Sequence, residues 1–141
     1  MNIRNYEDVD VLFEFLVKRY GFKHSYQEFT NGYNRNMFII THSFYNDNGC
    51  FTIQYVAQIC ELYFFRSKRF GETLDQMTEK NICAEVFSVE KDIWDKYNKL
   101  FLRIPNPFFE YNISKNLKAL AEVIQAQIDK TGKFFGISIQ Q

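Results

Sequence analysis

Apolar side chains recur three and four positions apart between residues 9 and 20, which is the spacing of one face of an amphipathic helix. The residues on this face are Val9, Leu12, Phe13, Leu16, Val17 and Tyr20. Asn5 is suited to cap the start of such a helix, Asp10 lies toward the positive end of its dipole, and Gly21 is suited to end it. The first 21 residues therefore predict a helix that packs on a core.

The apolar period changes to two between Phe22 and about Phe65, which is typical of β-strands. Residues 24–30 predict an edge strand, and residues 37–45 and 51–56 flank Asn46-Asp47-Asn48-Gly49, a turn sequence that favours positive φ. A two-residue loop (Asn48, Gly49) or a four-residue loop gives paired positions that sum to 97 or to 95. Both sums are odd, so His42 shares a face with apolar residues and Cys50 lies on the opposite, polar face. The sequence thus predicts an antiparallel meander in which these two residues do not form a catalytic pair.

Two patterns compete in the segment from Val56 to Ser67. Tyr63-Phe64-Phe65 favours one long or bulged strand that prolongs the hairpin. A three-residue spacing of Ile53, Val56, Ile59 and Leu62 is also compatible with a helix. We favour the strand and leave the helix open.

The second half is predicted to be mainly helical. A short helix is possible near residues 74–81, a better one follows Ser88 and ends before Pro105, and the strongest follows Ser114 and ends at Thr131-Gly132. The second is predicted to turn Ile93, Tyr97, Leu100 and Phe101 inward, and the third Leu117, Leu120, Ala121, Ile124 and Ile128. Residues 134–139 predict a final strand that returns to the sheet. The expected fold is one α+β domain over residues 1–141, with an N-terminal helix, an antiparallel β-meander, two to three C-terminal helices and this strand.

The composition is that of a folded protein. Hydrophobic residues make up 46% of the 141 positions and aromatic residues 18%, which suggests more aromatic surface than the core needs. The N-terminus has no signal-peptide pattern and no window reaches the roughly 18 apolar residues of a spanning helix, so we expect a cytoplasmic protein without a membrane partner. The three cysteines form no Cys-x-x-Cys pair, and we expect reduced thiols.

Motifs for chemistry are missing from the sequence. His24 and His42 are 18 positions apart, the Asn46-Asp47-Asn48-Gly49 stretch lacks the ligand spacing of a calcium loop, and no glycine-rich phosphate motif occurs. We therefore predict no catalytic residue, no metal site and no cofactor, and hence a protein that is not an enzyme. Two alternatives remain open: a small hydrolase or nuclease that uses His24, and a ligand-binding module with an aromatic pocket.

The charge distribution is uneven although the net charge is zero. Residues 71–95 contain seven acidic residues and two lysines, and residues 96–118 contain five basic residues and one acidic residue. Acidic clusters attract basic proteins and repel nucleic acid, and solvated helix faces are the plainer explanation. The candidate partner-binding residues are Glu72, Asp75, Glu79, Glu85, Glu90, Asp92 and Asp95. Arg66, Lys68 and Arg69 alternate with phenylalanines, and we interpret them as a solvated strand end and not as a nucleic-acid site.

Three stretches carry a resemblance to a known class of protein: Lys18-Arg19-Tyr20-Gly21-Phe22, Asn46-Asp47-Asn48-Gly49-Cys50-Phe51-Thr52-Ile53 and Lys130-Thr131-Gly132-Lys133-Phe134-Phe135-Gly136-Ile137. With this element order and size, the chain resembles the small cytoplasmic immunity proteins of bacterial polymorphic toxins, including those of contact-dependent growth inhibition systems. The resemblance implies a single-domain, non-enzymatic inhibitor, a monomer or weak homodimer, that binds a basic, nuclease-like toxin domain and blocks its active site.

Overall fold

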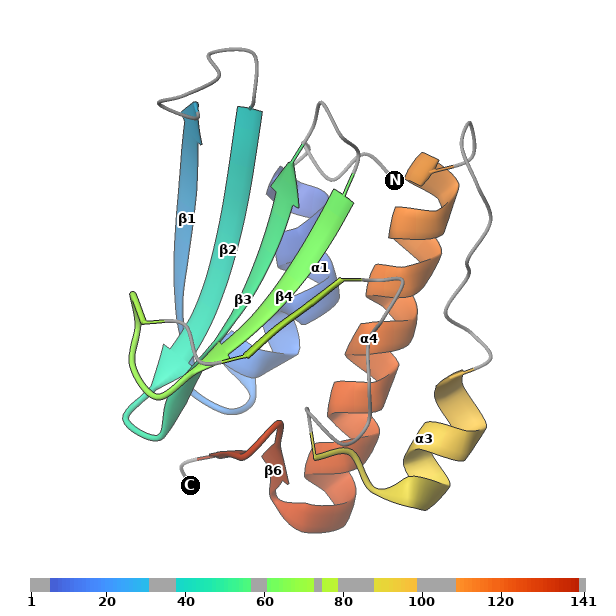
Figure 1. Cartoon of the computed structure of the whole chain (residues 1–141). Helices are drawn as coiled ribbons and strands as arrows, with labels where there is room; N and C mark the ends of the chain where they lie inside the picture. Colours follow the sequence, from blue (N-terminus) through green and yellow to red (C-terminus); the bar gives the residue numbers. More distant parts are fainter. Residues whose placement is uncertain are drawn as a thin grey trace.

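The computed structural model describes residues 6–30, 38–56, 61–72, 75–78, 88–98 and 109–139. Within these ranges five strands form an antiparallel sheet in the order β1-β2-β3-β4-β5, and two short strands form a second sheet. Figure 1 shows helices α1 and α4 on the same side of the large sheet, with α3 packed outside α4. The predicted α+β class, with its N-terminal helix, meander and C-terminal helices, is confirmed.

Helix α1 spans Tyr6–Lys18 and buries the predicted face against the sheet. Val9, Phe13 and Leu16 are fully buried, whereas Val17 is 39% exposed, so its predicted place on the buried face is wrong. Val17 lies at the edge of the apolar stripe and lines a cavity together with Val11 and His24. The helix ends at Lys18, and Gly21, the predicted stop, follows with a φ of +74° that favours glycine. The Gly21 amide donates to the carbonyl of Val17.

Strands β1 (Lys23–Thr30), β2 (Phe38–Asn46) and β3 (Gly49–Val56) pair in sequence order. In the β2–β3 hairpin the paired positions sum to 95, as in Asn46 with Gly49, and the loop consists of Asp47 and Asn48. No residue of this turn has a positive φ, so the predicted positive-φ geometry of the turn is wrong. The Asn46 side chain explains the difference: its Oδ1 accepts from the amides of Asn48 at 2.7 Å and Gly49 at 3.1 Å, which closes the turn.

Strand β4 (Glu61–Ser67) runs antiparallel to β3, and β5 (Asp75–Thr78) runs antiparallel to β4. The predicted single strand through residues 56–65 is therefore wrong, because the chain reverses between Val56 and Glu61; residues 57–60 lie outside the described residues. The strand assignment of Tyr63-Phe64-Phe65 is confirmed. The possible helix near residues 74–81 is replaced over 75–78 by β5, where pairing with β4 outweighs local preference.

Helix α3 spans Lys91–Tyr97 and α4 spans Phe109–Thr131. Helix α3 begins after Glu90, and not directly after Ser88, because Ser88 has a φ of 59°. Ile93 is buried as predicted; Leu100, Phe101 and Pro105 lie outside the described residues. Helix α4 begins earlier than predicted. Its predicted inward face is confirmed, since all five of these residues are buried: Leu117, Leu120, Ala121, Ile124 and Ile128.

Residues 133–138 form a small hairpin of their own, whereas the prediction was a final strand that returns to the sheet. Strands β6 (Lys133–Phe134) and β7 (Ile137–Ser138) pair with each other. Positive φ at Gly132, Phe135 and Gly136 turns the chain too tightly for a longer strand. The hairpin packs instead under the β2–β3 turn, where a Cβ on Gly49 would lie 2.7 Å from Ile137 Cγ1. The side-chain amides of Asn46 and Asn48 each donate to the Ser138 carbonyl at 3.0 Å.

Candidate functional site

Three polar residues from three different elements meet where α1 crosses the first two strands. Helix α1 supplies Asp10, β1 supplies His24 and β2 supplies His42. The register pairs His24 with Phe44 and Tyr26 with His42, so the two histidines are diagonal neighbours on one face of the sheet. This face is the one that α1 covers, which is why Asp10 reaches them.

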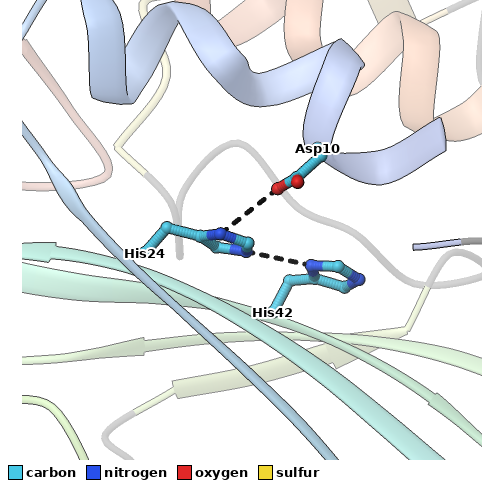
Figure 2. A group of neighbouring side chains, drawn as sticks. All are labelled: Asp10, His24 and His42. Carbon is cyan, nitrogen blue, oxygen red and sulfur yellow. Dashed lines mark hydrogen bonds and ion pairs between the residues drawn. The ribbon is translucent and has the colours of Figure 1, made fainter. Parts of the chain in front are cut away.

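The three side chains form a continuous chain of polar contacts (Figure 2). His24 Nδ1 lies 3.2 Å from Asp10 Oδ1, and His24 Nε2 lies 3.0 Å from His42 Nδ1. The pattern is satisfied with both rings neutral when His24 donates from Nδ1 to the carboxylate and accepts at Nε2 from the Nδ1–H of His42. The cluster is therefore a carboxylate–imidazole–imidazole chain.

Aromatic rings fix the orientation of both imidazoles. The Phe44 ring stacks on His24 with centroids 4.7 Å apart, and the Tyr26 ring lies 5.0 Å from that of His42. The two imidazole rings are nearly parallel, with an interplanar angle of 6°. Packing of this kind limits rotation of each ring and keeps its nitrogens directed at the neighbouring group.

Burial decides the charge of the two histidines. His42 is 1% exposed, and desolvation, followed by repulsion from a charged His24, lowers the pKa of His42 from 6.5 to about 4. Desolvation also lowers the pKa of His24, and the nearby Asp10 carboxylate partly offsets this effect. Both rings are therefore neutral near pH 7, which leaves one ring nitrogen of each with a lone pair.

A cavity of about 380 Å³ opens beside the cluster. Asp10 and His24 form one wall, and Val11 and Val17 provide apolar surface next to it. Val11 is 66% exposed and Val17 39% exposed, so both valines present apolar surface to solvent at this cavity. The remaining lining residues are Glu14, Lys18 and Phe44. The cavity thus gives solvent and small ligands a route to the carboxylate and to His24.

The described acidic residues of the predicted partner surface fall in two places. Glu72 lines a cavity on the outer face of the sheet, the face away from α1 and α4. Glu90, Asp92 and Asp95 are exposed at α3, which packs on α4 on the other side of the molecule (Figure 1). Asp92 is paired there with Lys130 at 2.6 Å. Asp75 is in β5; Glu79 and Glu85 lie outside the described residues.

The predicted separation of His42 and Cys50 is confirmed by the strand register. Cys50 faces outward with Ser43 and Thr52, and its sulfur lies 3.6 Å from Thr52 Oγ1. Burial raises the pKa of the Cys50 thiol, which is the opposite of what an activated nucleophile requires. Cys50 is 1% exposed and therefore acts as a packing residue.

The outer face of the sheet carries polar uncharged side chains bordered by aromatic rings. A hollow of about 300 Å³ lies across β1 to β4. Phe29 and Phe70 at its border are each 45% exposed, and the Phe70 ring stacks on Tyr45 at 4.7 Å between centroids. The hollow is lined by Gln27, Phe29, Thr41, Ser43, Thr52, Gln54, Phe65, Phe70, Gly71 and Glu72. Arg66, by contrast, donates to the Phe135 carbonyl at 3.1 Å, and Phe64 is fully buried.

Sequence reasoning missed the cluster because it compared the 18-residue spacing of the two histidines with known metal motifs. The signal lay in strand pairing, since residues of adjacent antiparallel strands meet whatever their separation in sequence. Asp10 was interpreted as a residue of the helix N-terminus, and its position one residue after buried Val9 placed it at the border of the sheet-facing side.

Comparison of the chain with family models, curated proteins and solved structures found no match. Among the described residues, no helix is long and apolar enough to cross a membrane.

Proposed function

We propose that this protein is a cytoplasmic immunity-type protein that binds a cognate toxin domain, a basic nuclease-like domain, and blocks its active site. The observation that carries the proposal is the outer face of the sheet, which α1 and α4 leave uncovered (Figure 1). This face combines exposed phenylalanines with hydroxyl and amide side chains.

Such a surface has the composition of a protein-binding face. Aromatic side chains act as anchors at interfaces, and uncharged polar groups supply hydrogen bonds at low desolvation cost. Phe29 and Phe70 stand at opposite borders of the hollow, on β1 and on the segment after β4. Between them lie Gln27, Thr41 and Gln54, whose side chains can donate and accept hydrogen bonds.

The charge of this face indicates which kind of partner would bind it. Glu72 is the acidic residue that lines the outer hollow, so a basic side chain of the partner would meet it there. The acidic residues of α3 lie away from this face, so they could form only a secondary contact with the partner. We therefore place the principal contact on the outer face and assign Asp95 no role in it.

The test begins with the gene immediately upstream. If that gene encodes a secreted protein with a basic C-terminal domain, the domain is purified and its binding to this protein is measured by titration calorimetry, together with its toxicity in cells that express this protein. Tight binding and rescue of growth support the proposal. A purified upstream domain that neither binds nor is neutralised contradicts it, as does a gene neighbourhood of metabolic enzymes.

Surface variants locate the contact. Phe29→Ala with Phe70→Ala should weaken binding by more than roughly tenfold, since interface aromatic anchors each contribute more than about 1 kcal/mol. Glu72→Lys should slow association at low salt, whereas Asp95→Lys, a matched charge reversal on α3, should not. Weakening by Asp95→Lys alone would move the contact surface to α3.

A second candidate function is a small hydrolase or nuclease, and the His24–Asp10 pair beside its cavity is the observation that favours it. A histidine oriented by a carboxylate is the arrangement of a general base. His24→Ala, assayed on ester, RNA and DNA substrates with folding checked by circular dichroism, distinguishes the two functions. Activity in the wild-type protein that this variant lacks would favour the enzyme.

A further inference from the structure

We propose that Asp10, His24 and His42 bind a divalent transition-metal ion, with Zn²⁺ as the best-suited ion. Two imidazoles and one carboxylate are a donor set that Zn²⁺ takes in proteins. The three residues come from α1, β1 and β2, so the metal would join the helix to the sheet. The site is independent of the outer face that we propose for toxin binding.

The distances match a small metal ion. One donor atom from each residue lies within 4.8 Å of the other two, and the contacts of 3.2 Å to Asp10 and 3.0 Å to His42 use opposite nitrogens of the His24 ring. Tetrahedral bonds of about 2.1 Å place ligand atoms about 3.4 Å from one another. Because an ion can take only one nitrogen of His24, it would replace one of these two contacts, and the remaining donor would come into range by a rotation of its side chain.

The electrostatic conditions also favour a cation. Metal ligation requires neutral imidazole, and both rings are neutral near pH 7 because burial lowers the pKa of each histidine. The Asp10 carboxylate supplies the negative charge that partly neutralises the ion. Its side chain is 38% exposed and that of His24 is 13% exposed, so the ion can enter from the cavity while His42 forms the buried end of the site.

Three protein ligands leave one position of a tetrahedral ion unfilled. In structural zinc sites the fourth ligand is a further side chain, whereas in open sites it is a water molecule or a bound ligand. The cavity of about 380 Å³, which Asp10 and His24 line, has room for such a fourth ligand. Glu14 lines the same cavity and forms an ion pair with Lys18 at 3.3 Å, so we assign it no ligand role.

The experiment measures Zn²⁺ binding to the full chain by titration calorimetry at neutral pH. All three cysteines are first replaced by serine, because thiolates bind Zn²⁺ by themselves. Asp10→Asn, His24→Ala and His42→Gln should each weaken binding by more than roughly tenfold, since even the loss of an outer-shell partner costs about 10–100-fold. Glu14→Gln is the matched control in the same cavity and should bind Zn²⁺ as tightly as the cysteine-free parent protein does.

Substitution of Co²⁺ for Zn²⁺ in the cysteine-free protein gives a second readout that leaves all three proposed ligands intact. Visible absorption typical of tetrahedral Co²⁺ and paramagnetic broadening of the His24 and His42 ring signals support the site. If His42→Gln does not fold, these signals decide the question in the protein with both histidines intact. The proposal would be overturned if the cysteine-free parent and its His24→Ala variant bound Zn²⁺ with equal affinity. Broadening confined to other residues, or a loss of affinity with Glu14→Gln equal to that with His24→Ala, would also overturn it.

Discussion

The stability of the metal-free protein should fall as the pH is lowered through the range in which buried His42 resists protonation. Its pKa is about 4 in the folded protein and 6.5 in an unstructured chain. Between these values the unfolded state binds more protons than the folded state, so acid shifts the equilibrium toward unfolding. The stabilising effect of a neutral His42 is complete above about pH 7 and is lost progressively as the pH falls.

The magnitude follows from the two pKa values. At about 1.36 kcal/mol per pH unit, the interval from 6.5 to about 4 corresponds to a total of about 3.4 kcal/mol. Linkage arithmetic gives a loss of about 2 kcal/mol between pH 7 and pH 5. His24 should add to the loss, because its pKa is lowered in the same direction, and Asp10 opposes that addition.

The assay is urea unfolding at pH 7 and pH 5 in a buffer that contains a chelator, followed by the fluorescence of Trp94, the single tryptophan. His42→Gln removes the titrating ring. Between pH 7 and pH 5 the free energy of unfolding of this variant should therefore fall by about 2 kcal/mol less than that of the unmodified protein. Restricting the range to pH 5 and above avoids most carboxylate titration.

The result that would refute the reasoning is an equal pH dependence of both proteins. A direct measurement covers the case in which the variant does not fold: the ring signals of His42 in a nuclear magnetic resonance titration should keep their neutral positions down to about pH 5. A midpoint near 6.5 would show that burial does not suppress the charge of this ring.

Three further predictions concern packing. Phe13→Ala should lower the free energy of unfolding in urea by about 3–5 kcal/mol, because Phe13 is fully buried. Val11→Ala, on the exposed side of the same helix, should lower it little. Equal losses would contradict the described orientation of α1. Gly49→Ala should lower the free energy of unfolding by about 1–3 kcal/mol, because its Cβ would clash with Ile137. The loss should be clearly smaller in an Ile137→Ala background, and an unchanged loss there would exclude the clash as the cause. Cys50, in a variant whose other two cysteines are serine, should react with a thiol reagent at least about tenfold more slowly in the native protein than in urea, and rapid native labelling would show that the thiol is accessible.

Local patterns predicted the parts of the fold that depend on neighbours in sequence. The apolar stripe of α1 gave the buried residues Phe13 and Leu16, and the odd sum of paired positions placed His42 and Cys50 on opposite faces whichever loop length applied. Parity is robust because every side chain on a strand alternates, so an uncertain turn does not change the faces.

The misassigned parts depend on contacts between distant residues. Val56 and Glu61 lie in separate antiparallel strands, although the sequence between them contains no Gly, Pro, Asn or Asp that would indicate a turn. The C-terminal strand was assigned to the sheet because Phe134 and Ile137 suit a strand, and the decisive feature was the positive φ of the residues between them. No single window of sequence contains that information.

The candidate site was beyond prediction for a related reason. His24 and His42 are neighbours because of the register of β1 and β2, which the sequence pattern of either strand alone does not specify. Asp10 joins them only through the angle at which α1 crosses the sheet. The sequence therefore predicts the face of the sheet on which His42 lies, and it does not predict that Asp10 and His24 lie beside it.

The packing of Ile137 on Gly49 has a consequence for the order in which the protein is assembled. The hairpin turn is synthesised early, yet the residues that cover it and the Ser138 carbonyl that accepts from Asn46 come about ninety positions later. Closing so long a segment is entropically costly, and contacts of this range slow folding. During translation one end of the meander therefore stays uncovered until residues 137 and 138 have left the ribosome, and a nascent chain halted before residue 137 should remain susceptible to proteases at this turn.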